Sequence, residues 1–166
     1  HCLDARKGMD VEITTSMLVG DLNKHLHANT TPEKYATFCF GVYDDATHTL
    51  TYTNAGHLPP ILLRNGETRF LEVNGTVVGA FPFSRYEESR IRLEPGDLLL
   101  FYTDGITEAE NAYGEQFGEE RLCDLLRKRT GSTSSEILAS IVEQVKEWTG
   151  SGELQDDMTL LLAIRT

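Results

Sequence analysis

Two acidic segments, far apart in the chain, each adjoin a hydrophobic run. Asp104 follows the run 98–102, and Asp156 and Asp157 precede the run 160–164. Carboxylates beside buried strands are costly unless something neutralises their charge. A divalent cation does this well, because hard cations take oxygen ligands. The sequence therefore predicts a metal site and, with it, hydrolytic chemistry.

Each acidic segment also has a simpler explanation when it is taken alone. Asp104-Gly105 is a common turn pair, in which the glycine lets the backbone turn without crowding. Asp156-Asp157 could be a solvated acidic loop. Neighbouring side chains on a strand point to opposite faces. At most one of this pair therefore faces the same site as Asp104, unless both residues precede the strand.

His57 lies in the loop Asn54–Pro60 between two expected strands. It could be a metal ligand, a general acid or a structural hydrogen-bonding residue, and we favour the structural role. The other histidines have no zinc-type spacing. The chain has no P-loop, no dinucleotide fingerprint and no nucleophile elbow, so neither a nucleotide cradle nor a serine or cysteine nucleophile is indicated.

Composition narrows the choice of function. A chain of 166 residues is expected to form one domain, 1–166. Its net charge of −11 argues against nucleic acid and against an anionic membrane surface as partners. Three cysteines without metal-type spacing favour a reducing cytoplasm, and neither a membrane span nor a signal peptide is visible. Because the chain begins at His1, we expect a piece of a longer protein.

Hydrophobic periodicity predicts the elements that must position these residues. Asn65-Gly66 is typical of a type I′ hairpin turn, and Thr133–Glu136 has the form of a capping box. Strands separated from helices along the chain favour an α+β fold with antiparallel sheets. Helices are expected over 13–27, over 117–128 and after Thr133, and strands over 37–43, 49–53, 60–64, 68–73, 88–93, 98–102 and 158–164.

Five segments together resemble the PP2C (PPM) superfamily of metal-dependent protein phosphatases, in its bacterial SpoIIE/RsbU-like branch. Their order and spacing agree with that family from about residue 14 to residue 166. The string around Asp104, combined with Asp-Asp-Met-Thr near the end, is the most specific part. The five segments are Thr53–Pro60, Gly75–Gly79, Leu93–Asp97, Phe101–Ala109 and Asp156–Thr159.

The resemblance implies a fold and a site. The fold would be α+β, a PP2C-like sandwich of two antiparallel β-sheets flanked by α-helices (αββα). The site would hold two Mn²⁺ or Mg²⁺ ions that activate a water for hydrolysis. By position, Asp104 and Asp156 would be catalytic metal ligands. The implied metal-binding set is Asp104, Gly105, Asp156 and Asp157, with Asp157 as a supporting or alternate ligand.

The resemblance also implies a substrate. Members of this branch remove phosphate from serine or threonine on STAS-type anti-sigma-factor antagonists, and so regulate sigma factors in the cytoplasm. Their phosphatase domains commonly follow an N-terminal sensor or receiver domain. We therefore expect a metal-dependent phosphoserine/phosphothreonine protein phosphatase with a phosphorylated antagonist as partner, and neither nucleic acid nor membrane.

The match breaks near the N-terminus. Family members carry an early motif of the form Asp-Val-Ser-Gly, which supplies a metal ligand that bridges the two ions. In this sequence, Asp4–Met9 is only a weak, partial match to that motif. Either an N-terminal portion is absent, or the protein is a degenerate phosphatase that keeps the fold for binding. An unrelated acidic metal-binding protein is a third reading. Two carboxylates alone would bind a cation weakly, and a bare sheet edge could be covered in a homodimer.

Overall fold

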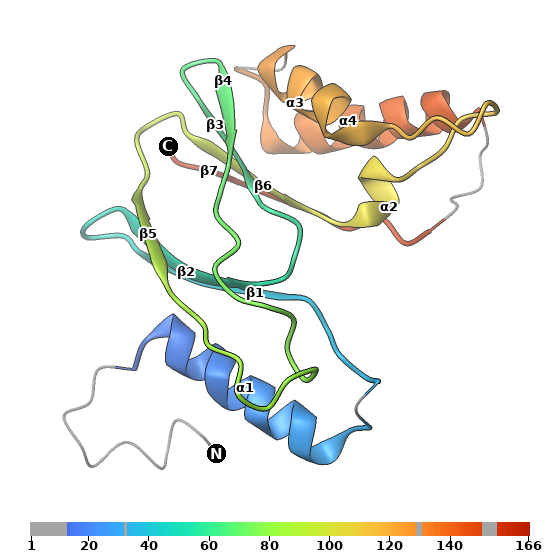
Figure 1. Ribbon diagram of the computed structural model, residues 1–166. Coiled ribbons are helices and arrows are strands. Elements are labelled where there is room, and N and C mark those ends of the chain that lie inside the picture. The colour runs from blue at the N-terminus through green and yellow to red at the C-terminus, as the bar shows by residue number, and fades with distance from the viewer. Residues whose placement is uncertain (1–12, 32, 129–130, 151–155) are drawn as a thin grey trace. The chain divides into compact units, whose positions relative to one another are not determined.

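The structure is a computed structural model that describes residues 13–31, 33–128, 131–150 and 156–166. The chain divides into two compact units, each with its own antiparallel sheet (Figure 1). The first unit combines His1–His57 with Glu72–Leu93, and the second combines Leu58–Leu71 with Glu94–Thr166. No helix in the described ranges is both long and apolar enough to cross a membrane. A single domain over 1–166 stays a prediction.

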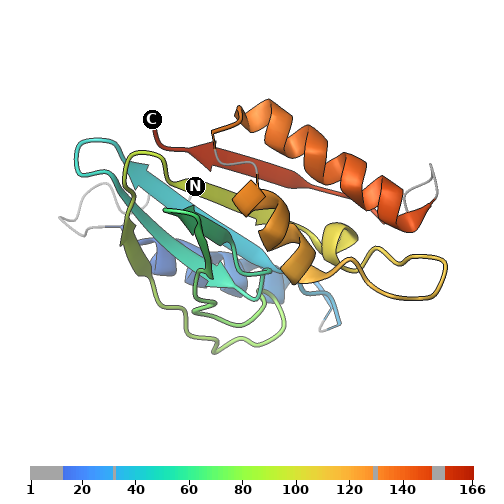
Figure 2. The ribbon, with the colours of Figure 1, turned by 90° about the horizontal axis from the view of Figure 1, so that it is seen from above.

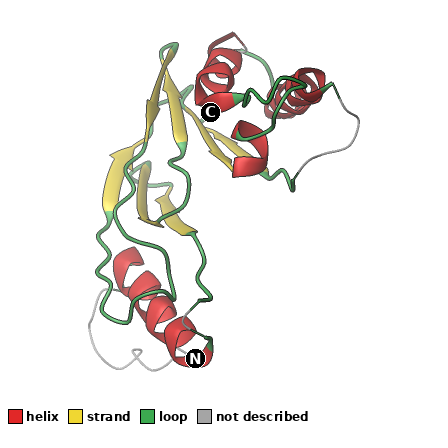
Figure 3. Cartoon of the chain, turned by 45° about the vertical axis from the view of Figure 1, so that its right-hand side comes forward, coloured by secondary structure: helices red, strands yellow, loops and turns green. Residues whose placement is uncertain are grey.

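Among its described residues, the first unit has one helix and a three-stranded sheet (Figure 3). Val19, on the helix, is buried together with Ala55 and Val78. Asn23, one helical turn further on, is also buried. Its side-chain amide forms hydrogen bonds with backbone groups of the loop that follows Val78. The sheet order is β1-β2-β5, and the elements are α1 (Thr15–Asn29), β1 (Phe38–Asp44), β2 (Thr49–Ala55) and β5 (Ser89–Arg92).

The described part of the second unit has the other sheet and three helices. Its strands lie in the order β4-β3-β6-β7, so β7 is an edge strand among the described strands. Helix α4 lies along β7 (Figure 2). The elements are β3 (Ile61–Arg64), β4 (Glu67–Phe70), β6 (Leu98–Tyr102), α2 (Asp104–Thr107), α3 (Gly118–Lys128), α4 (Ser134–Thr149) and β7 (Leu160–Ile164).

Every second side chain of β6 faces the core of the second unit. Leu98, Leu100 and Tyr102 join one buried cluster with the apolar faces of α3 and α4. Thr133 begins α4 with the predicted capping box, in which its side chain accepts from the backbone of Glu136 and the Glu136 carboxylate accepts in return. This core gives β6 a fixed position, and β6 carries the residues that precede Asp104.

An ion pair between partly exposed Arg64 and buried Asp97 fixes the turn before β6. Asp97 is 2% exposed and accepts hydrogen bonds from Arg64 Nε and Nη2. Its carboxylate also accepts from the backbone N–H of Glu94 at 2.7 Å. Burial by itself raises the pKa of the Asp97 carboxyl, but Arg64 and the Glu94 N–H together lower it below its ordinary value. The ion pair thereby joins β3 to the start of β6.

The predicted elements are confirmed, with ends that differ by a few residues. The Asn65-Gly66 turn has positive φ at both residues, 52° and 81°, as a type I′ turn requires. The α+β class with two antiparallel sheets and helices is also confirmed. Two features differ. The short helix α2 was not predicted, and the last strand begins at Leu160 rather than Met158.

Candidate metal centre

Asp104 lies directly beyond a buried strand. Strand β6 ends at Tyr102, Thr103 is the N-cap residue of α2, and Asp104 is the first residue of that helix. The Asp104 side chain is exposed, and its Oδ1 accepts a hydrogen bond from the Gly105 N–H at 3.0 Å. The carboxylate is therefore held at a rigid point of the fold and faces solvent.

Asp156 and Asp157 precede β7 instead of lying on it. Both are exposed, and Asp156 Oδ1 accepts from the Asp157 N–H at 2.7 Å. Because the pair lies before the strand, the rule that adjacent strand residues face opposite ways does not separate the two carboxylates.

The two acidic segments meet through their backbones. A Cβ placed on Gly105 would stand 2.5 Å from the carbonyl oxygen of Asp157 and 3.5 Å from the carbonyl carbon of Asp156. Real Cβ atoms essentially never come closer than 3.0 Å to another heavy atom. Glycine at position 105 is therefore what allows the segment of Asp104 to lie against that of Asp156 and Asp157.

Thr103 ties the same two segments together. In the antiparallel register, Tyr102 pairs with Leu160, and the Thr103 N–H donates to the Thr159 carbonyl at 3.2 Å. Thr103 Oγ1 accepts from the Thr159 N–H at 3.0 Å and donates to the Asp157 carbonyl at 3.3 Å. Sequence reasoning did not single out Thr103 or Thr159, although both lie inside the strings of the family resemblance.

The prediction that each acidic segment adjoins a buried strand is confirmed for Asp104, which follows β6, and wrong for Asp156 and Asp157, which precede β7. The predicted loss of hydration is wrong for all three carboxylates, because all three are exposed. Leu161, Ala163 and Ile164 of β7 are exposed as well, since β7 is an edge strand among the described strands. The case for a cation therefore rests on how the two segments converge.

The donors present fit a hard cation only in part. Exposed carboxylates next to a backbone carbonyl are the oxygen ligands that Mn²⁺ and Mg²⁺ accept. Within the described ranges, no group of three or more histidine, cysteine, aspartate or glutamate side chains could hold a metal. The segment Asp4–Met9, the weak match to the family's Asp-Val-Ser-Gly motif, lies outside the described residues. The described carboxylates thus account for part of a ligand shell.

His57 has the structural surroundings that we favoured for it. Its N–H donates to Asn54 Oδ1 at 2.8 Å, and the Asn54 amide donates back to its carbonyl at 3.1 Å. The ring Nδ1 lies 3.3 Å from Thr37 Oγ1. Asn54 is fully buried, and its own N–H donates to Asn74 Oδ1. The loop is therefore held by side chain to backbone bonds within the first unit.

Comparison with known proteins identifies relatives over nearly the whole chain. The family model "Stage II sporulation protein E (SpoIIE)" matches residues 5–166. Protein IcfG of Synechocystis is 36% identical over 133 residues, which are 79% of this chain and 21% of that protein. Phosphoserine phosphatase RsbU of Bacillus subtilis is 27% identical over 92% of this chain and 46% of its own length. The chain thus spans less than half of these relatives.

Solved structures agree in fold. The SiaA-PP2C domain of Pseudomonas aeruginosa matches 98% of this chain and 65% of its own chain, with a TM-score of 0.79 and 19% identity. The phosphatase domain of SpoIIE from Bacillus subtilis matches 99% and 72%, with a TM-score of 0.70 and 19% identity. These matches confirm the PP2C-like fold class. The family model establishes that the chain belongs to the SpoIIE family, and the solved structures show that its fold is PP2C-like.

Proposed function

We propose that this chain is the phosphatase domain of a Mn²⁺- or Mg²⁺-dependent phosphoserine/phosphothreonine protein phosphatase. Its substrate is a phosphorylated STAS-type anti-sigma-factor antagonist, and its setting is cytoplasmic signalling that regulates a sigma factor. Membership in the SpoIIE family supports the reaction class, and the relative RsbU, which is named a phosphoserine phosphatase, supports the substrate class. In the longer protein, a sensor or receiver domain would precede this domain.

The observation that carries the proposal is the contact between Gly105 and Asp157. It brings the backbone that bears Asp104 against the backbone that bears Asp156. Those two carboxylates would hold a cation, with Gly105 and Asp157 completing the predicted metal-binding set. Bound Mn²⁺ or Mg²⁺ supplies a water of lowered pKa and stabilises charge on the phosphoryl oxygens.

This chain's own residues have a positioning role in the proposal. Thr103 and Gly105 hold the two carboxylate segments at a fixed spacing. A fixed spacing favours the reaction, because a nucleophile and a phosphoryl group react fast only when they are well aligned. The carboxylates are exposed: Asp104 lies just beyond the inner strand β6, and Asp156 lies before β7, the edge strand of the described sheet. A phosphoserine on the surface of a folded protein can therefore reach them.

Phosphate release provides the test. The full chain is incubated with a serine-phosphorylated antagonist or with p-nitrophenyl phosphate, with Mn²⁺ or with excess chelator. Asp104→Asn should abolish Mn²⁺-dependent release, whereas Asp45→Asn, an exposed carboxylate in a turn of the first unit, should not change it. Full activity in excess chelator, or in Asp104→Asn, would refute the proposed mechanism.

A binding module without turnover is the second candidate. It is favoured by one observation: no cluster of three or more metal-ligating side chains occurs within the described ranges. A module of this kind would bind the phosphorylated antagonist at a measurable affinity and release no phosphate at any Mn²⁺ concentration. Calorimetric binding, run beside the release assay, separates the two functions.

A further inference from the structure

A projecting hairpin begins two residues after α2. We call residues 109–117 the Tyr113 hairpin: the Phe117 N–H donates to the Ala109 carbonyl at 2.8 Å, and Glu110 and Gln116 form an antiparallel bridge. Figures 1 and 2 show this segment extending beyond α2, the short helix that Asp104 begins. Tyr113 at its tip is 90% exposed.

The tip of the hairpin has a fixed conformation. Asn111 Oδ1 accepts from the N–H groups of Tyr113 at 2.9 Å and of Glu115 at 3.0 Å. The Gly114 N–H donates to the Asn111 carbonyl, and Gly114 takes φ 76°, which favours glycine. The Tyr113 ring is thus displayed on an ordered turn.

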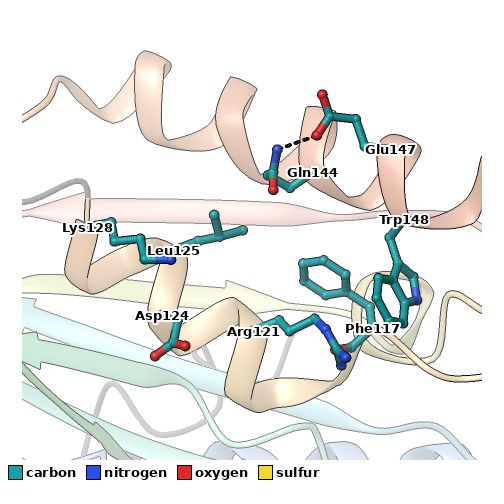
Figure 4. A pocket seen from close by; sticks show the side chains of 8 residues that line it. All are labelled: Phe117, Arg121, Asp124, Leu125, Lys128, Gln144, Glu147 and Trp148. Atoms are coloured by element: carbon teal, nitrogen blue, oxygen red, sulfur yellow. Dashed lines mark hydrogen bonds between the residues drawn. The ribbon is translucent and has the colours of Figure 1, made fainter.

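The base of the hairpin is attached to α3 and α4. Trp148 Nε1 donates to the Glu115 carbonyl at 3.0 Å, and Arg121 Nη1 donates to the Phe117 carbonyl at 2.9 Å. The Arg121 guanidinium lies 3.9 Å from the centre of a Trp148 ring, and Phe117 packs edge-on against that indole (Figure 4). Phe117 is itself 3% exposed in the core cluster. The hairpin is therefore continuous with the rigid part of the second unit.

An exposed aromatic side chain on a fixed support has the properties of a binding residue. Tyrosine buries a large area at low cost in side-chain entropy, and it is enriched among the residues that dominate interface energies. A turn that is already ordered adds little further entropic cost on binding. Within residues 108–116, the charged side chains are Glu108, Glu110 and Glu115, all exposed. A partner surface that complements the hairpin is apolar where it contacts the Tyr113 ring and basic around that contact.

We infer that the Tyr113 hairpin is a docking element for the folded phosphoprotein substrate, contacting it beside its phosphorylated serine. This inference rests on the proposed function. The hairpin follows Asp104 along the chain with only α2 and Glu108 between them, so a folded protein docked on the tip has to extend past one short helix to meet the carboxylates. Tyr113 affects how a protein substrate binds, and plays no part in the chemical step.

The test compares a large substrate with a small one. The full chain and its variants are assayed with Mn²⁺ on a serine-phosphorylated STAS-type antagonist and on p-nitrophenyl phosphate. Tyr113→Ala should raise KM for the antagonist about tenfold at unchanged kcat. It should leave both constants for p-nitrophenyl phosphate unchanged. Glu110→Lys should raise KM for the antagonist in the same way.

Two variants serve as controls. Tyr113→Phe keeps the ring and should retain most of the affinity. Phe83→Ala removes an aromatic side chain that is 92% exposed in the first unit, and it should change neither substrate's constants. Because Tyr113 is exposed, its truncation should leave the thermal unfolding midpoint unchanged, and this measurement shows that the variant is folded.

Each other outcome has a definite meaning. An unchanged KM in Tyr113→Ala, or an equal loss on both substrates, overturns the docking role. An unchanged KM in Glu110→Lys overturns the basic character of the partner surface. If the wild-type chain releases no phosphate from either substrate, the proposed function itself is wrong. If it hydrolyses p-nitrophenyl phosphate and spares the antagonist, the substrate class is wrong and the docking partner with it.

Discussion

The carbonyl oxygen of Asp157 lies 2.5 Å from the point where Gly105 would carry a Cβ. Two segments that are about fifty residues apart in sequence thus touch through main-chain atoms, and each bears a carboxylate predicted to hold a metal. The contact depends on the absence of one methyl group, so a single substitution tests its importance.

Gly105→Ala should separate the two acidic segments. The added methyl group has backbone as its neighbour, which cannot rotate away, so we expect about 1–3 kcal/mol of destabilisation from overpacking. A shift of about 1 Å between the carboxylates should lower phosphate release about a hundredfold. Denaturant unfolding and the release assay measure the two effects.

The matched control for that variant is Gly20→Ala. Gly20 lies within α1, and a Cβ there would meet only the Tyr86 ring, at an ordinary 3.9 Å. Since alanine favours a helix interior over glycine by about 0.5–1 kcal/mol, this variant should be slightly more stable and equally active. Full activity in Gly105→Ala would mean that close approach of the segments is dispensable.

Thr103→Val should weaken the same junction without adding bulk. The change removes the hydroxyl that accepts from the Thr159 N–H and donates to the Asp157 carbonyl. We expect a loss of about 1 kcal/mol in the free energy of unfolding, and a fall in activity, because Asp157 is then less firmly placed. Thr103→Ser keeps the hydroxyl and should retain both properties. Identical activity in the valine and serine variants would exclude a positioning role.

Mn²⁺ should stabilise the folded chain even without substrate. If the Asp104 and Asp156 carboxylates hold the ion with a Kd near about 0.1 mM, about 1 mM Mn²⁺ adds about 1.4 kcal/mol to the free energy of unfolding, or roughly 3–6 °C in Tm. Asp104→Asn should remove this shift, and Asp45→Asn should retain it. Differential scanning calorimetry gives the answer independently of activity. A shift that survives in Asp104→Asn would place the ion elsewhere.

The Arg64–Asp97 pair should make stability depend on acid pH. The folded-state pKa of Asp97 is lowered, so near pH 3–4 the unfolded chain binds more protons than the folded chain at this group. The contribution of Asp97 is fully present above about pH 4, its ordinary pKa, and is lost as pH falls through the lower folded-state value. Asp97→Ala should cost about 1–3 kcal/mol at pH 7, because Arg64 Nε and the Glu94 N–H lose a buried acceptor, while Arg64 keeps its ion pair with the Glu94 carboxylate.

Asp124→Ala is the control for that pair. Asp124 forms an ion pair with Arg127 on the surface of α3, where both side chains are well exposed. We expect a change of no more than about 0.5 kcal/mol. Urea unfolding at pH 7 and at pH 3.5 should show a smaller acid loss in Asp97→Ala than in the wild-type chain. Equal losses in the two proteins would contradict the assigned role of the pair.

The sequence by itself determined most of the helices and strands. Periodicity, the Asn65-Gly66 turn and the capping box at Thr133 act over a few residues, so they can be read locally, and the structure has each of them. The string around Asp104 also pointed correctly to the family. Local pattern does not reveal strand neighbours, however, and the supposed burial of the last strand was therefore wrong.

Only the tertiary structure determined which residues far apart in the sequence contact one another. The register of β6 with β7 places Thr103 opposite Thr159, and from that pairing follows the contact of Gly105 with Asp157. Likewise, the attachment of the Tyr113 hairpin to Trp148 joins residues more than thirty positions apart. Such contacts depend on how sheets and helices pack at long range. They bring together residues whose proximity the neighbouring residues in the chain do not specify.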